Sequence, residues 1–382
     1  MTTSDVILPP AAPIPAARWP RWSVALTVAG AIVMVLAVVA SRVNLSYYVL
    51  VPGVAQPVQP MLTVPAGLEH PLHGKVLLTD VGIGQVSALN YLFDTFNNNV
   101  QLVPTGELLG GVPPSEFNAE GTVQMTESQL TAVAVAERQL GMPVPENDSG
   151  VVIYATSPGT GAFQSLQVGQ VITAVDGVPT PDLPSLVAAV RTHAPGTIVH
   201  VAIGSMTAPT ASRTVDVKLA QTREHGQSVT ILGVVGYDQP AYQVPFPVHI
   251  ASNGIGGPSA GLAFTLGILD SVSGGGLTGG RVIAATGTIH PDGSIGAVGG
   301  IPQKTIAVEN AGAKVFLVPA SEARQATTKV RDGLVVLPVS TLSQAIADLV
   351  RLGGHAGSAA SGPVQGPDGH SAPVDWNTTP WA

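Results

Sequence analysis

The chain has 382 residues, of which 45% are hydrophobic and only 10% charged, with a formal net charge of −8. This composition can bury a large core, which excludes wholesale disorder, and the few Lys and Arg residues argue against nucleic-acid binding because no basic face is available to neutralise phosphates. The absence of cysteine excludes disulfides, thiolate catalysis, iron–sulfur clusters and zinc fingers. The length predicts two or three domains.

The first predicted element is a membrane anchor. Ser23 to Ala40 contains 18 residues without a charge, which as a helix is roughly 27 Å long, about the thickness of a bilayer core. Arg18 and Arg21 precede the run and favour a cytoplasmic N-terminus. We therefore expect a cytoplasmic tail (1–22), a transmembrane anchor (23–42) and a catalytic part outside the cytoplasm, in a single-pass cell-membrane protein. The alternative is a signal peptide cleaved after Ala40.

Residues 43–140 contain no recognisable chemistry. A strand is expected at 75–79, and an amphipathic helix at 127–140 with Thr126 as its N-cap. We expect this region to be a lead-in that packs on the following domains.

Residues 141–222 have the pattern of a small β-rich domain. The sequence predicts a strand at 150–154, a hairpin turn at Asp176-Gly177 and a helix at 183–192 that starts near Asp182 or Pro184. The segment SPGTGAFQSLQVGQVITAVDGVP at 157–179 resembles PDZ domains of the kind that accompany bacterial proteases. The resemblance implies a groove that binds an extended peptide as an added strand. The alternative is a spacer without a ligand.

Residues 223–352 are expected to form an α+β domain, followed by a disordered tail rich in Gly, Ser, Ala and Pro at 353–382. The expected strands lie near 247–251, 281–286, 314–318 and 334–337. The expected helices lie at 258–270, 302–311 and 341–351.

The most informative segment of this domain surrounds Ser259. Pro258 suits the first position of a helix, which would place Ser259 in the first turn, where backbone N–H groups lack partners within the helix. Those donors, including the N–H of Ala260, are suited to an oxyanion, and Gly257 permits close approach of a substrate backbone. Ser259 is therefore the candidate nucleophile of an acyl-transfer site.

The candidate base is Lys304. Pro302 predicts a second helix start, which places Lys304 in the first turn next to Ile301, Ile306 and Ala307. Burial and the positive end of a helix both lower a lysine pKa, as a neutral amine base requires.

Three segments of this region resemble the signature segments of Lon-type serine proteases: GGPSAGLAF at 256–264, ATGTI at 285–289 and GGIPQKTIAVENAGAKVFLVP at 299–319. The resemblance implies that Ser259 is the nucleophile, Lys304 its general base, and Thr286 a hydrogen-bonding support for the lysine amine. With the anchor and the PDZ-like region, the layout resembles membrane-anchored, PDZ-containing Lon-like proteases of Gram-positive and actinobacterial type. It also implies a ring-like homo-oligomer.

The sequence therefore predicts a membrane-anchored Ser-Lys endopeptidase acting on unfolded or flexible protein or peptide substrates, with no cofactor, metal or nucleic-acid partner. The 382 residues contain no G-x-x-x-x-G-K-[ST] phosphate loop, so hydrolysis is expected to proceed without ATP.

Three alternatives remain open. One is a Ser-His-Asp protease that uses His249 or His290 with Asp292 or Asp270. Another is a small-molecule kinase with phosphate at the glycine-rich loop. The third is a membrane-tethered, peptide-binding scaffold without activity.

Overall fold

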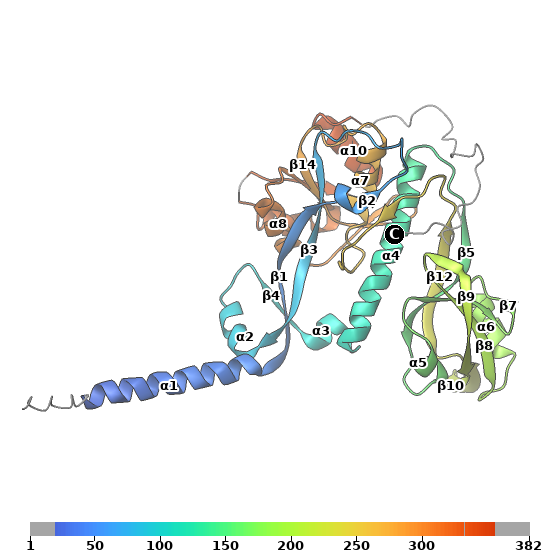
Figure 1. Ribbon diagram of the computed structural model, residues 1–382, viewed down its shortest axis with the longest axis horizontal. Helices are drawn as coiled ribbons and strands as arrows, with labels where there is room; N and C mark the ends of the chain where they lie inside the picture. The colour runs from blue at the N-terminus through green and yellow to red at the C-terminus, as the bar shows by residue number, and fades with distance from the viewer. Residues whose placement is uncertain (1–19, 332, 356–382) are drawn as a thin grey trace, which may run out of the picture.

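The computed structural model describes residues 20–331 and 333–355 (Figure 1). Most of the two expected tails, residues 1–19 and 356–382, lies outside the described residues. Helix α1 (Arg21–Arg42) has 22 residues, none of them buried, and extends away from the other elements. It is the one helix among the described residues that is long and apolar enough to cross a membrane. This finding supports the predicted anchor by length and composition.

A six-stranded sheet forms one half of the molecule and takes strands from both ends of the chain, in the order β18-β17-β14-β3-β1-β4. Strands β3, β14, β17 and β18 run parallel, whereas β1 is antiparallel to both β3 and β4. The strands are β1 (Asn44–Pro57), β3 (Lys75–Ser87), β4 (Gln101–Pro104), β14 (Val282–Ala285), β17 (Val315–Pro319) and β18 (Val335–Val339). Segments that the sequence analysis assigned to a lead-in thus belong to the same sheet as the segments around residues 282–339.

Helices cover both faces of this sheet because its strands bury side chains alternately on each side. Leu78, Ile283 and Leu317 pack with α7 (Gly261–Val272), while Leu77 and Phe316 pack with α8 (Ile301–Asn310). The remaining helices of this half are α2 (Ala88–Asp94), α3 (Thr105–Leu109), α4 (Pro114–Gln139), α9 (Ala323–Thr327) and α10 (Leu342–Arg351). Short strand pairs complete it: β2 (Leu62–Thr63) with β13 (His249–Ile250), and β15 (Thr288–Ile289) with β16 (Ile295–Gly296).

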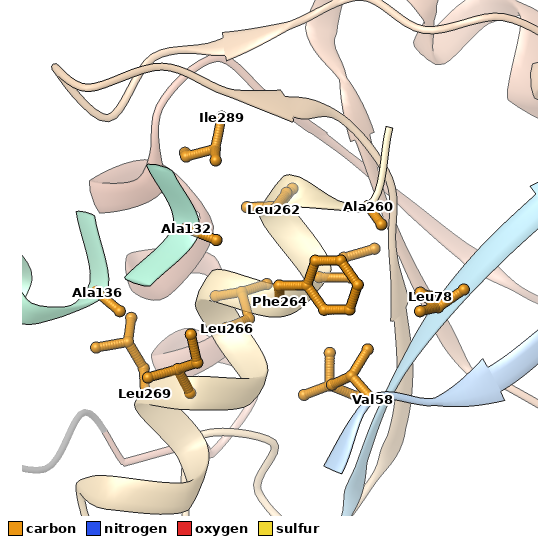
Figure 2. Close-up of a cluster of buried hydrophobic side chains, with 14 of the residues drawn as sticks. Val58, Leu78, Ala132, Ala136, Ala260, Leu262, Phe264, Leu266, Leu269 and Ile289 are labelled. Atoms are coloured by element: carbon orange, nitrogen blue, oxygen red, sulfur yellow. The ribbon is translucent and has the colours of Figure 1, made fainter. Parts of the chain in front are cut away.

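Helix α7 is almost entirely buried, between α4 and the sheet. Figure 2 shows Phe264 of α7 directed towards Leu78 of β3, while Leu266 lies on the side of α7 that faces Ala136 of α4. The largely apolar sequence of α7 follows from this position, since every side of the helix contacts protein.

Helix α4 begins much earlier than predicted. The expected start at Thr126 is wrong: the helix begins at Pro114, and Thr126 Oγ1 bonds to the Thr122 carbonyl one turn earlier. A hydroxyl that bonds to the backbone four residues back belongs inside a helix rather than at its N-cap. Proline at the first helical position supplies the real start.

A second sheet forms the middle domain, in the order β12-β5-β6-β8-β9, with β7 paired to β6. Its elements are β5 (Glu146–Thr156), α5 (Gly161–Ser165), β6 (Gln170–Val175), β7 (Val178–Pro179), α6 (Leu183–Arg191), β8 (Ile198–Ser205), β9 (Ala208–Lys218) and β12 (Val234–Tyr242), with a separate hairpin of β10 (Ala220–Glu224) and β11 (Gln227–Ile231). Two sequence predictions are confirmed here. Asp176 and Gly177 both have positive φ in the β6–β7 hairpin turn, and Asp182 caps α6 by accepting the Ser185 N–H.

Helix α4 contacts the middle domain directly (Figure 1). Gln124 donates to the hydroxyl of Tyr154 at 2.9 Å, and the hydroxyl of Tyr237 donates to Glu127 at 3.0 Å. Val123 packs with buried valines of β5 and β6. The same helix therefore contacts the middle domain and the apolar helix α7.

Candidate active site

Ser259 lies immediately before α7 rather than in its first turn. The predicted helix start at Pro258 is wrong, because α7 begins at Gly261 with Ala260 at the N-cap. The Ser259 carbonyl accepts hydrogen bonds from Gly287 N–H at 3.0 Å and from Thr286 Oγ1 at 3.2 Å. In a helix that began earlier, the Ser259 carbonyl would accept a backbone hydrogen bond from within the helix. Because it accepts bonds from Gly287 and Thr286 instead, Ser259 lies in the loop before α7.

Helix α4 holds the loop that carries Ser259. The carbonyl of Gly121 accepts the Gly257 N–H at 2.7 Å, and Ser128 Oγ donates to the Pro258 carbonyl at 3.1 Å. A Cβ at Gly121 would lie 3.6 Å from the Gly257 nitrogen, so the two backbones approach closely. These contacts could not be predicted from the sequence, because more than 100 residues separate α4 from the loop.

Lys304 lies in the first turn of α8, as predicted. The helix begins at Ile301 after Gly300, whose φ of 71° places it in the left-handed region that favours glycine. The Lys304 side chain is only 3% exposed. Its Nζ donates to Ser259 Oγ at 2.8 Å and to Thr286 Oγ1 at 3.0 Å. The structure thus brings together the three side chains that the sequence placed in separate motifs.

The surroundings of Lys304 favour its neutral form. Burial lowers the pKa of the amine from 10.5 to about 8, and the negative charges of Glu322 and Asp80 limit the fall. Glu322 accepts the Val298 N–H at 2.8 Å, and Asp80 accepts the Val54 N–H at 2.6 Å, so both carboxylates are held by backbone groups. Neither carboxylate could be assigned to the site from the sequence, because neither lies in a recognisable motif. An amine with a pKa near 8 is partly neutral at neutral pH and can accept a proton.

Backbone donors also lie next to the serine hydroxyl. Within the described residues, the N–H groups of Ser259 and Ala260 have no acceptor at hydrogen-bond distance, whereas the Gly257 N–H is engaged by Gly121. The N–H groups of Ser259 and Ala260 are therefore available to an incoming oxygen, whereas the N–H of Gly257 is not.

The acids of the alternative triad have other partners. Asp270, near the far end of α7, accepts the Leu277 N–H at 2.9 Å, and Asp292 accepts the Ser294 N–H at 2.9 Å in its turn. His290 Nε2 lies 3.5 Å from Thr288 Oγ1. Both carboxylates thus stabilise local loops. In the part of the chain that the structure describes, no three His, Asp or Glu side chains gather into a metal site.

Comparison with known families adds to this geometry. Residues 233–351, which contain Ser259, Thr286 and Lys304, match the model of the Lon protease (S16) C-terminal proteolytic domain. This region is a Lon-type proteolytic domain. Lon protease 2 of Bacillus subtilis (strain 168) is 30% identical to the chain over 124 residues, which are 32% of this chain and 21% of that protein. A Lon protease of Chloroflexus aggregans is 30% identical over 92 residues, 23% of this chain and 11% of that protein.

The chain thus spans only about a tenth to a fifth of the length of these Lon relatives. Among solved structures, the PDZ domain of an SdrC-like protein from Listeria monocytogenes matches at 18% identity with a TM-score of 0.20, over 23% of this chain and 87% of that domain. Strands β1 and β3 precede the matched residues but pair within the same sheet as β14, β17 and β18.

Proposed function

We propose that this protein is a membrane-anchored serine endopeptidase that hydrolyses peptide bonds without ATP, with Ser259 as nucleophile and Lys304 as general base. The observation that carries the proposal is the hydrogen bond of 2.8 Å between Lys304 Nζ and Ser259 Oγ, made by an amine whose pKa burial has lowered to about 8. A nucleophile, a base and a third group that orients the base form the general pattern of covalent catalysis. Thr286 is that third group.

The catalytic cycle follows from the positions of these groups. Lys304 takes the proton of Ser259 as Oγ attacks the scissile carbonyl carbon, and the N–H groups of Ser259 and Ala260 stabilise the oxyanion. Lys304 then gives the proton to the leaving amine, which releases the first product and leaves an acyl-enzyme. A water molecule, deprotonated by the same amine, attacks the ester and regenerates Ser259.

The location of the reaction is part of the proposal. Helix α1 would anchor the chain, with Arg18 and Arg21 on the cytoplasmic side, and the sheets would lie outside the cytoplasm. Free ATP is scarce there, and the 382 residues carry no phosphate loop. The substrates would be unfolded or flexible protein segments, because a chain without a nucleotide motor has no source of energy to unfold its substrates.

The middle domain is proposed to bind the substrate or a regulatory peptide. Strand β12 is an edge strand that contacts α6, and its Val235 is 56% exposed. An extended peptide can add to such an edge through backbone hydrogen bonds. We expect Val235→Glu to weaken peptide binding, while Ile198→Glu, at a 60% exposed position on β8, leaves it unchanged. Equal effects of both variants would contradict this assignment.

The decisive experiment follows casein degradation without ATP by the full chain in detergent. Wild type should cleave casein, and Ser259→Ala and Lys304→Met should not, although both retain the circular dichroism of the wild type. Full activity of Lys304→Met would contradict the proposed base. If no form cleaves casein and a fluorophosphonate fails to label Ser259, the scaffold without activity becomes the better description.

A further inference from the structure

Helix α2 and the turn after it carry large apolar side chains in solvent. Leu92, Phe93 and Phe96, here called the α2 patch, are 58%, 65% and 80% exposed. Together with Leu89 they follow the i, i+3, i+4, i+7 spacing of an apolar helix face, which in a globular domain normally faces the core. Here Leu92, Phe93 and Phe96 are exposed to solvent instead, which marks the α2 patch as a contact surface.

The α2 patch lies beside the end of the proposed membrane helix. The Ala88 N–H at the start of α2 donates to the Val43 carbonyl, immediately after α1, at 2.8 Å. Helix α2 then packs along the last part of α1 (Figure 1). The ring of Tyr91 packs on Tyr47 of β1, with centroids 5.1 Å apart, which fixes α2 in this position. If α1 spans a bilayer, α2 therefore lies at the depth of the lipid headgroups.

The charges around the patch indicate which surface covers it. Residues 81–93 contain no charged residue, and Asp94 is the only one between 81 and 106. Residues 81–106 themselves carry no lysine or arginine, although Arg42 ends α1 and Lys329 donates to the Asn98 carbonyl after α2. Binding by the α2 patch itself would therefore depend on apolar insertion rather than on its own charge. Exposed aromatic side chains next to the end of a membrane helix are typical of the bilayer interface.

We propose that the α2 patch inserts into the interfacial region of the leaflet where α1 ends, and gives the protein a second point of contact with lipid. This inference rests on the proposed anchoring by α1. Two contacts hold the long strands β1 and β3, which lead from this point into the Lon-type sheet, at a defined angle to the membrane. The active site is thereby kept at a defined height and orientation above the surface.

The absence of cysteine allows a direct test by single labelling sites. The full chain is reconstituted in phosphatidylcholine vesicles as Phe96→Cys or Phe93→Cys, each labelled with an environment-sensitive fluorophore. Val33→Cys, in the middle of α1, serves as a probe of anchoring, and Ile198→Cys, on the middle domain, as an aqueous control. Emission is followed with a quencher attached to the lipid chains and with a quencher in water.

We expect the labels at 93 and 96 to emit at shorter wavelength than the label at 198 and to be quenched from the lipid. If the labels at 93 and 96 are quenched only from water, while the label at 33 is quenched from lipid, the inference is overturned and the anchor stands. Protection from both quenchers that increases with the protein-to-lipid ratio would overturn it in favour of a second copy of the chain. Quenching of the label at 33 from water would overturn the anchor and this inference together.

Discussion

Ser128 of α4 donates its hydroxyl to the carbonyl oxygen of Pro258, the residue before the candidate nucleophile, at 3.1 Å. The contact joins the middle of a long helix to the loop whose geometry decides where Ser259 Oγ lies. The same helix contacts the middle domain through Gln124 and Glu127. Helix α4 therefore connects the middle domain to the loop that carries Ser259.

Removing the Ser128 hydroxyl should lower kcat without unfolding the protein. A net hydrogen bond contributes about 1 kcal/mol, so Ser128→Ala is expected to reduce kcat about fivefold through misplacement of Ser259. Peptide hydrolysis measures the effect. Thr122→Ala is the matched control, because the Thr122 hydroxyl bonds only within α4. Equal losses in the two variants would show that the loop contact is not responsible.

The rate of hydrolysis should rise with pH. Only the neutral amine of Lys304 can accept the serine proton, and its pKa of about 8 means that the neutral fraction grows tenfold per pH unit below that value. We expect kcat/KM to be about a hundredfold lower at pH 6 than on a plateau above pH 9. A profile that falls through this range would exclude a neutral lysine base.

The carboxylate of Glu322 should set the midpoint of that profile. Its negative charge raises the pKa of Lys304, so Glu322→Gln is expected to move the midpoint to lower pH, while the amide oxygen still accepts the Val298 N–H. The pH profile of kcat/KM is the measurement. Glu224→Gln, at a surface ion pair on the middle domain, should leave the midpoint unchanged. A midpoint that moves upward would refute the assigned electrostatic role.

The hydroxyl of Thr286 should be required for orientation of the amine. Thr286→Val keeps the shape of the side chain but removes the acceptor 3.0 Å from Lys304 Nζ and the donor to the Ser259 carbonyl. We expect kcat to fall about 10- to 100-fold, by analogy with other groups that position a catalytic base. Thr286→Ser should restore most of the activity. If the kcat of Thr286→Ser is as low as that of Thr286→Val, loss of methyl packing rather than loss of hydrogen bonding is the cause.

Buried Glu137 of α4 should make stability depend on pH. Burial raises the pKa of its carboxyl to about 8, and the Phe246 backbone partly opposes this rise. Because the unfolded state loses its proton near pH 4.5 and the folded state near 8, the free energy of unfolding falls as pH increases between these values. Glu137→Gln removes this penalty. Urea unfolding should show a gain of about 4 kcal/mol at pH 8 and little gain at pH 4. An equal gain at both pH values would contradict the shifted pKa.

Local motifs predicted much of the site because each occupies a short, contiguous segment. Ser259, Thr286 and Lys304 lie in three such segments, and proline and glycine next to them mark real turns and helix starts to within three residues. The contacts between the segments could not be derived in this way. Ser128 and Asp80 reach the site from elements that precede the middle domain, and no periodicity relates residues so far apart.

The extent of the Lon-type sheet was also beyond local reasoning. The apolar stretch at 75–79 predicted a strand, but its parallel partner β14 lies about 200 residues later in the chain. Likewise Pro113-Pro114 is a common helix start but also a common loop, so only tertiary contacts distinguish the long α4 from the shorter helix expected at 127–140. The apolar periodicity of α4 is weak because its two sides contact different parts of the protein.

The placement of the middle domain between β3 and β14 affects how the enzyme is made. Ribosomes add about 5–20 residues per second, so β3 is synthesised roughly 10–40 s before the strand that pairs with it in parallel. The middle domain has its own hydrophobic core and can complete its fold within this interval. The sheet that supports Ser259 and Lys304 closes only when β14 and β17 arrive, near the end of synthesis. The proposed pair of Ser259 and Lys304 is therefore incomplete for most of the time that the nascent chain spends on the ribosome.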